Sequence, residues 1–124
     1  MKIKSFLVAL SLSGCVTMPV PPQGSLMPPG DAPTTEQMET QLKAYLGRTL
    51  KDPGSLQQFK ITRAPYHKVW QVNDFSPYRS DWIVCFEYNA KNSYGGYGGV
   101  TQGTSIFSYG VLVDAFSKPM PMFC

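Results

Sequence analysis

The spacing of apolar residues changes at Pro53, and this change constrains the fold more than any other feature of the sequence. Before Pro53, apolar residues recur every three or four positions and form one face of a predicted helix: Met38, Leu42, Tyr45, Leu46, Thr49 and Leu50. Thr34 and Gln37 have the spacing of a capping box, which starts the helix at residue 34 or 35. The residue before a proline avoids the helical conformation, so the helix should end ahead of Pro53, and residues 52–55 should form a turn.

After this turn, apolar and polar residues alternate, as is typical of strands. We expect short strands around residues 59–62 and 66–72, a longer strand at 81–89 and a last long strand at 105–116. The strand at 81–89 has Trp82, Val84, Phe86 and Tyr88 on one face and Ile83, Cys85 and Glu87 on the other. The strand at 105–116 has Phe107, Tyr109, Val111, Val113 and Ala115 on one face.

These elements predict an α+β fold, with one N-terminal amphipathic helix packed on a small, mainly antiparallel sheet of three or four strands. The chain has 124 residues, enough for one domain, which we place at residues 34–124. Hydrophobic residues make up 43% of the chain and charged residues 15%, so the composition excludes a wholly disordered protein. The longest apolar runs fall short of the ~20 residues that a transmembrane helix needs.

The first fifteen residues have the pattern of a secretory signal. Lys2 and Lys4 precede a short apolar run, which ends in the sequence Leu12-Ser13-Gly14-Cys15. These four residues resemble the lipobox of bacterial lipoproteins. The resemblance implies that residues 1–14 are a cleaved signal peptide and that the thiol of Cys15 carries a diacylglyceryl group, with further acylation such as palmitate. The alternative is an ordinary cleaved signal beside an unrelated cysteine.

A lipoprotein would be held on the lipid bilayer through acylated Cys15, in the oxidising cell envelope, which includes the periplasm. Val16 follows this cysteine rather than an aspartate, and by resemblance to the sorting rule of Gram-negative lipoproteins we expect the outer membrane. Most of the formal charge of +3 leaves with the signal, because Lys2 and Lys4 are removed. We therefore expect no nucleic-acid partner.

Residues 15–33 contain the lipidated cysteine and a proline-rich linker. Its prolines are Pro19, Pro21, Pro22, Pro28, Pro29 and Pro33. Such a segment favours an extended conformation and would hold the domain up to roughly 50 Å from the bilayer when fully stretched. The alternative is a proline-rich ligand for a partner.

Two cysteines remain in the domain, Cys85 within a predicted strand and Cys124 at the last position. In an oxidising compartment we expect one disulfide between them, which would hold residues 118–123 against the sheet. A free, buried Cys85 and an intermolecular bond through Cys124 are the alternatives.

The sequence contains no arrangement that requires an enzyme. His67 is the single histidine, so a serine or cysteine nucleophile would have to use it, and its neighbours do not form a known motif. One histidine and two bonded cysteines cannot supply the ligands of a zinc site, and the carboxylates lack calcium-loop spacing. We expect no cofactor and no metal.

Two blocks of sequence carry a further resemblance. They are Leu50-Lys51-Asp52-Pro53-Gly54-Ser55, followed by Phe59, and the run Val84-Cys85-Phe86-Glu87-Tyr88-Asn89-Ala90-Lys91-Asn92-Ser93-Tyr94-Gly95-Gly96-Tyr97-Gly98-Gly99. Together they resemble a group of small, uncharacterised bacterial envelope proteins, which have a Lys-Asp-Pro-x-Ser turn and a cysteine-bearing strand leading into an Asn-Ala-Lys-Asn-Ser block and a Gly-Tyr loop. The resemblance implies a shared fold more than a function. This chain differs in having Phe86 where the group has a small residue, and Gly98-Gly99 where the group has one glycine.

The polar end of the second block is the candidate site. We interpret the following residues as a partner-contact loop: Asn89, Lys91, Asn92, Tyr94 and Tyr97. Asparagine side chains bond neighbouring backbone groups and would fix the loop that presents the two tyrosines, which are rigid and amphipathic. The alternatives are a purely structural turn and a nucleotide site, and the latter lacks the Gly-Lys-Ser/Thr ending of a phosphate loop.

The sequence therefore predicts a membrane-anchored envelope lipoprotein that acts as a non-enzymatic interaction module with a protein partner. An inhibitor or exclusion factor acting on an incoming lysozyme or phage is the alternative, by analogy with other small anchored domains. A small-ligand-binding protein or a hydrolase is less favoured.

Overall fold

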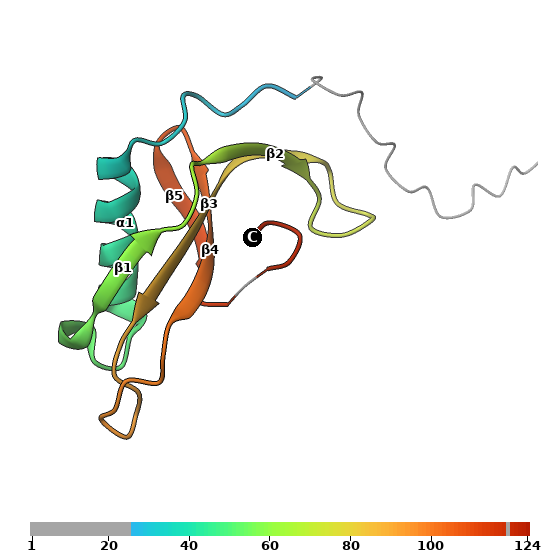
Figure 1. Ribbon diagram of the computed structural model, residues 1–124. Coiled ribbons are helices and arrows are strands. Elements are labelled where there is room, and N and C mark those ends of the chain that lie inside the picture. Colours follow the sequence, from blue (N-terminus) through green and yellow to red (C-terminus); the bar gives the residue numbers. More distant parts are fainter. Residues whose placement is uncertain (1–25, 119) are drawn as a thin grey trace, which may run out of the picture.

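The computed structural model describes residues 26–118 and 120–124 and shows one α-helix packed on a five-stranded antiparallel sheet (Figure 1). The elements are α1 (Thr35–Thr49), the 3-10 turn η1 (Pro53–Ser55), β1 (Gln57–Ile61), β2 (Tyr66–Trp70), β3 (Arg79–Asn89), β4 (Thr101–Ser108) and β5 (Val111–Phe116). The predicted helix on an antiparallel sheet is confirmed. The predicted signal peptide, Cys15 and the first part of the linker lie outside the described residues.

The helix starts and buries its apolar face as its sequence predicts. The hydroxyl of Thr34 accepts a hydrogen bond from the Gln37 amide at 3.1 Å, and the Gln37 side chain accepts one from the Thr34 amide at 2.9 Å. Met38, Leu42 and Leu46 are buried. The predicted N-terminal position is wrong, because thirty-four residues precede α1 in the chain.

The sheet is built around β3. Its order is β1-β3-β4-β5, and β2 also pairs with β3, so that β1 and β2 lie end to end along the same side of β3. The prediction of three or four strands is wrong because the expected strand at 105–116 folds back on itself. Tyr109 and Gly110 have φ values of 51° and 75°, as in a two-residue hairpin turn, and this turn separates β4 from β5. β4 also begins at Thr101, four residues before the expected start at residue 105.

The hairpin also changes the predicted burial of the residues around it. Tyr109 stands in the turn and Val111 follows it, and both are exposed. The β4–β5 register shifts between Ile106 and Phe107, and Val113 is the extra, exposed residue of this bulge. The predicted apolar face of 105–116 therefore keeps only its first and last members in the core. The alternation of apolar and polar residues continues through this turn, and the first residue of the turn is a tyrosine rather than the usual asparagine or glycine. The sequence pattern therefore does not indicate the turn.

Strand β3 is covered on both faces. Val84, Phe86 and Tyr88 form one core with the buried face of α1. On the other face, Ile83 and Cys85 form a second, smaller core with Ile106 and Phe123. The predicted division of β3 into two faces is confirmed. Figure 1 shows α1 on one side of the sheet and the C-terminal segment on the other.

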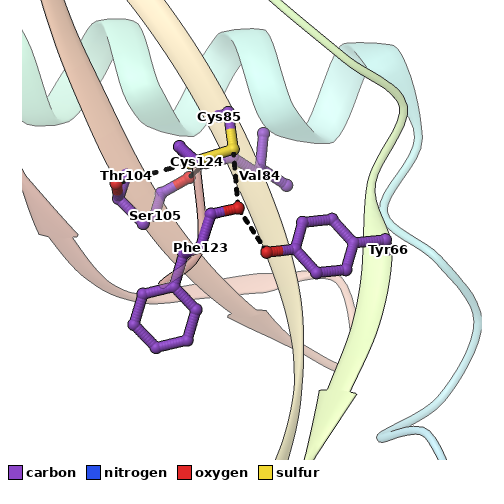
Figure 2. Close-up of a disulfide and its surroundings, with 7 residues drawn as sticks. All are labelled: Tyr66, Val84, Cys85, Thr104, Ser105, Phe123 and Cys124. Carbon is purple, nitrogen blue, oxygen red and sulfur yellow. Dashed lines mark hydrogen bonds between the residues drawn. A yellow bond between two sulfur atoms is a disulfide. The ribbon is translucent and has the colours of Figure 1, made fainter. Parts of the chain in front are cut away.

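The disulfide Cys85–Cys124 is present, as predicted, and holds the C-terminal segment against the second face (Figure 2). Phe123 is buried there, and its ring meets the Trp70 ring edge-on at 5.4 Å between centroids. The Tyr66 hydroxyl donates to the Phe123 carbonyl. Burial raises the pKa of Tyr66, and the nearby Arg63 cation acts in the opposite direction, so the hydroxyl keeps the proton that it donates.

Phe86 fits into the core because its cross-strand partner is a glycine. Gly103 of β4 stands directly opposite Phe86 of β3, and a Cβ atom at Gly103 would overlap the phenyl ring. Phe86 is completely buried and its ring also stacks near Phe59 and Tyr88. The large side chain of Phe86 is therefore matched by the absence of a side chain at Gly103 on the next strand.

We expect Gly103→Ala to lower the free energy of unfolding by about 2 kcal/mol, because overpacking a dense core costs about 1–3 kcal/mol. Chemical denaturation measures the change. Gly96→Ala is the matched control, because a Cβ atom there meets no atom within 4 Å. Equal stability of the two variants would contradict the account of the Phe86 packing.

Candidate partner-contact loop

The segment after β3, residues 91–99, is an ordered loop that we call the Gly-Tyr loop. A β-bridge joins Lys91 and Tyr97, and the Asn92 amide donates to the Gly96 carbonyl at 2.8 Å. The Asn92 side-chain oxygen accepts from the amides of Tyr94 at 2.9 Å and Gly96 at 3.3 Å. Asn92 therefore organises the loop from its base, as its side-chain chemistry allows.

The Gly-Tyr loop is tied to the turn that ends the helix. The Lys91 amide donates to the Ser55 hydroxyl at 2.8 Å, and the Tyr97 hydroxyl donates to the Ser55 carbonyl at 3.0 Å. Lys51 donates to the Ser93 hydroxyl at 2.6 Å. The two sequence blocks that carry the resemblance are thus in contact, with the buried Ser55 as their junction.

The two tyrosines of the loop have different surroundings. Tyr94 is 96% exposed, whereas Tyr97 is 43% exposed, with its hydroxyl bonded to Ser55. The ammonium of Lys91 lies 5.9 Å from the centre of the Tyr97 ring. Tyr97 and Lys91 therefore support the loop, and Tyr94 is its most accessible aromatic side chain.

Asn89 lies apart from the surface of the loop. It is the last residue of β3 and is buried, and its side-chain nitrogen Nδ2 donates to the side-chain oxygen of Gln58 at 3.5 Å. Its side-chain oxygen is buried and has no hydrogen-bond partner among the described residues. The structure thus brings Lys91, Asn92, Tyr94 and Tyr97 together in the loop, whereas Asn89 is buried at the end of β3.

Sequence reasoning missed the contribution of Lys51 and Ser55 to this loop. Both stand in the turn block of the resemblance, about forty positions before the loop. Two polar blocks stand apart in the sequence, and their spacing alone does not show that they meet in the fold.

His67 and Ser80 are neighbours, but their hydrogen bonds run in the wrong direction for nucleophilic catalysis. The His67 Nε2 atom lies 2.6 Å from the Ser80 hydroxyl oxygen, and this hydroxyl donates to the Met27 carbonyl at 2.6 Å. The imidazole is therefore the donor to Ser80, whereas activation of a serine needs the imidazole as acceptor.

The buried carboxylate of Asp81 has a structural role. It accepts from the Trp70 indole at 2.9 Å and pairs with Arg79 at 3.2 Å, and the Arg79 guanidinium lies 5.0 Å from the centre of the Trp70 ring. Among the described residues, no group of three or more His, Cys, Asp or Glu side chains is placed to hold a metal ion. No helix in residues 26–118 has the length and apolarity to cross a membrane.

Residues 27–33, the last part of the segment that we predicted to be a linker, lie on the domain. The carbonyl of Met27 accepts from Ser80, the carbonyl of Pro29 accepts from the Tyr109 amide at 2.8 Å, and the carbonyl of Gly30 accepts from the Trp82 indole at 3.2 Å. Pro29 and Pro33 are buried. We call residues 27–33 the strap. The strap forms hydrogen bonds with residues near the start of β3, whereas the Gly-Tyr loop follows the end of β3 (Figure 1).

Comparison with known proteins gives no relative: no family model, no curated protein and no solved structure matches the chain.

We expect Asn92→Ala to speed the hydrogen exchange of the Tyr94 and Gly96 amides about five- to tenfold, because each hydrogen bond that is lost stabilises the loop by about 1 kcal/mol. Asn92→Asp keeps the acceptor oxygen and is the matched control, with exchange close to that of the wild type. Unchanged exchange in Asn92→Ala would show that the backbone alone holds the loop.

Proposed function

We propose that the protein is a lipid-anchored envelope lipoprotein and that its domain is a non-enzymatic module which contacts another envelope component through the Gly-Tyr loop. The observation that carries this proposal is Tyr94, which is almost fully exposed on a loop whose backbone is held by hydrogen bonds to Asn92 and Ser55. A rigid, amphipathic ring on a preorganised loop loses little entropy when it is bound, which suits a contact residue.

The arrangement of strap and loop supports an anchor at Cys15. The strap bonds to Ser80 and Trp82 near the start of β3, and the loop follows Asn89 at its end. The eleven residues of β3 span about 35 Å at about 3.3 Å per residue. A tether from Cys15 would therefore enter the domain at the strap end of β3, and Tyr94 lies beyond the other end of this strand. The residue after Cys15 favours the outer membrane as the site of the anchor.

The contacts of the titratable side chains support the non-enzymatic part of the proposal. His67 donates to a serine that is itself bonded to the strap, and Asp81 is occupied by Arg79 and Trp70. These side chains hold together the end of the domain at which the strap lies. Their hydrogen bonds have a structural explanation that needs no substrate.

Photo-crosslinking from position 94 tests the proposal. A photoreactive tyrosine analogue is placed at position 94 in the full chain, and adducts are collected from the membrane fraction. We expect one discrete adduct. Tyr109 is the matched control, because it is also an exposed tyrosine, at 76%, but lies in the turn beside the strap. Position 97 is a poorer site, since its hydroxyl is bonded to Ser55.

The anchor is checked in the same cells with a clickable fatty acid. The wild-type chain should take up the label and Cys15→Ala should not. Equal adducts from positions 94 and 109, or none from position 94 in a labelled and folded protein, would contradict a partner at the Gly-Tyr loop. An adduct that forms only when the cells are challenged with a lysozyme or phage would favour the alternative of an inhibitor or exclusion factor.

A further inference from the structure

The two edge strands of the sheet differ in whether side chains form hydrogen bonds with their outward-facing backbone groups. At the β5 edge, the Gln41 side chain donates to the Gly110 carbonyl and accepts from the Leu112 amide, both at 2.7 Å. Tyr45 donates to the Ala115 carbonyl at 3.2 Å. Side chains of α1 thus occupy polar groups along β5, and a further strand cannot add there without displacing them.

The opposite edge, at β1, presents backbone groups to the outside. The Thr62 amide donates to the Cys85 carbonyl at 3.0 Å, and Lys60 pairs with Glu87 two positions further along β3. Backbone groups alternate in direction along a strand, so the amide and carbonyl of Ile61 and the carbonyl of Phe59 point away from β3. They form a short template for an additional antiparallel strand.

A groove accompanies this edge on the side of the helix. A cavity of about 540 Å³ lies between the first turns of α1 and β1. Met38, Phe59 and Ile61 provide its apolar surface, and Arg63 and Glu39 also line it. Glu39 lies 3.9 Å from the Lys43 ammonium. The groove can accept apolar side chains from a strand that pairs with Ile61.

The two strands at this edge carry positive charge. Residues 57–72, which contain β1 and β2, include Lys60, Arg63 and Lys68 and no aspartate or glutamate, while Glu87 stands opposite Lys60 on β3 and Glu39 lies on the helix side of the groove. Lys60 lies on the face of the sheet opposite to Phe59 and Ile61, because neighbouring residues of a strand point to opposite faces. A strand added at β1 therefore meets a cation on one face and an apolar groove on the other.

This charge disfavours a second copy of the chain as the added strand. Antiparallel pairing of two β1 strands about Lys60 places the two lysines directly opposite each other, and pairing about Ile61 places them on one diagonal. Like charges at these positions are destabilising. A carboxylate at the same position is stabilising, so the edge selects a different partner.

We propose that the β1 edge binds an extended, acidic segment of a partner protein in which acidic and apolar residues alternate. A carboxylate of this segment faces Lys60, and the neighbouring apolar side chain enters the groove beside Met38 and Ile61. The surface is separate from the Gly-Tyr loop, and the proposal does not depend on the function proposed for that loop.

The test uses the full chain, isotopically labelled and kept in detergent, with a short capped peptide in which glutamate alternates with valine. We expect this peptide to shift the Ile61 amide resonance and to slow its hydrogen exchange about tenfold, since the amide gains a backbone hydrogen bond. A peptide in which lysine replaces each glutamate should do neither. Lys60→Glu should reverse the preference between the peptides, whereas Lys118→Glu, at an exposed site outside the edge, should keep it.

Three results would overturn the proposal: no change at Ile61 with the glutamate peptide, equal effects of the two peptides, or a concentration-dependent shift of Ile61 without any peptide. The last result would indicate pairing between copies of the chain. Because the two peptides are compared on the wild-type protein, the test does not depend on the folding of a variant.

Discussion

Strand β3 is apolar on both faces, and the remaining structure follows from the need to cover both. A sheet with one buried face needs a single covering layer, but Ile83 and Cys85 on one face and Val84 and Phe86 on the other need two. The helix provides the first layer. The second layer is a short, irregular segment in which Phe123 is buried and Met120 partly buried, and so short a segment cannot order itself by burial alone. The covalent bond between Cys85 and Cys124 holds it in place.

Strand β3 also connects the strap with the Gly-Tyr loop. Near its start, strand β3 donates hydrogen bonds from the Ser80 hydroxyl and the Trp82 indole to carbonyls of the strap. Its last residue leads into the Gly-Tyr loop, which Ser55 ties to the turn after the helix. The strand with the most complete burial in the domain therefore joins the end where the chain enters to the end where Tyr94 is exposed. The strap and the proposed contact loop therefore lie toward opposite ends of β3.

The elements that local signals specify could be predicted from the sequence. The capping box of Thr34 and Gln37, the breaking effect of Pro53 and the alternation in β3 each act over a few residues, and each prediction is confirmed. The pairing of Cys85 with Cys124 was predicted because only two cysteines remained for the domain. The β4–β5 hairpin was missed because Tyr109 adopts a positive φ that tyrosine seldom takes, in a setting where the strap's Pro29 carbonyl accepts from its amide.

The candidate site was predicted only in part, for a similar reason. The role of Asn92 follows from the chemistry of its own side chain. The support from Ser55 and Lys51, the burial of Asn89 and the different exposure of the two tyrosines depend on contacts between segments far apart in the chain. Such contacts leave no local trace in the sequence.

The central claim is that the disulfide-held segment covers the second face of β3. Hydrogen exchange of the intact protein, followed with and without reductant, tests it most directly. The C-terminal segment is held by this bond and packs on Tyr66 and Trp70 of β2, so reduction should raise exchange more in residues 120–124 and in β2 than in α1 and β4. Unchanged exchange in β2 after complete reduction would contradict the claim, as would equal loss of protection throughout the domain.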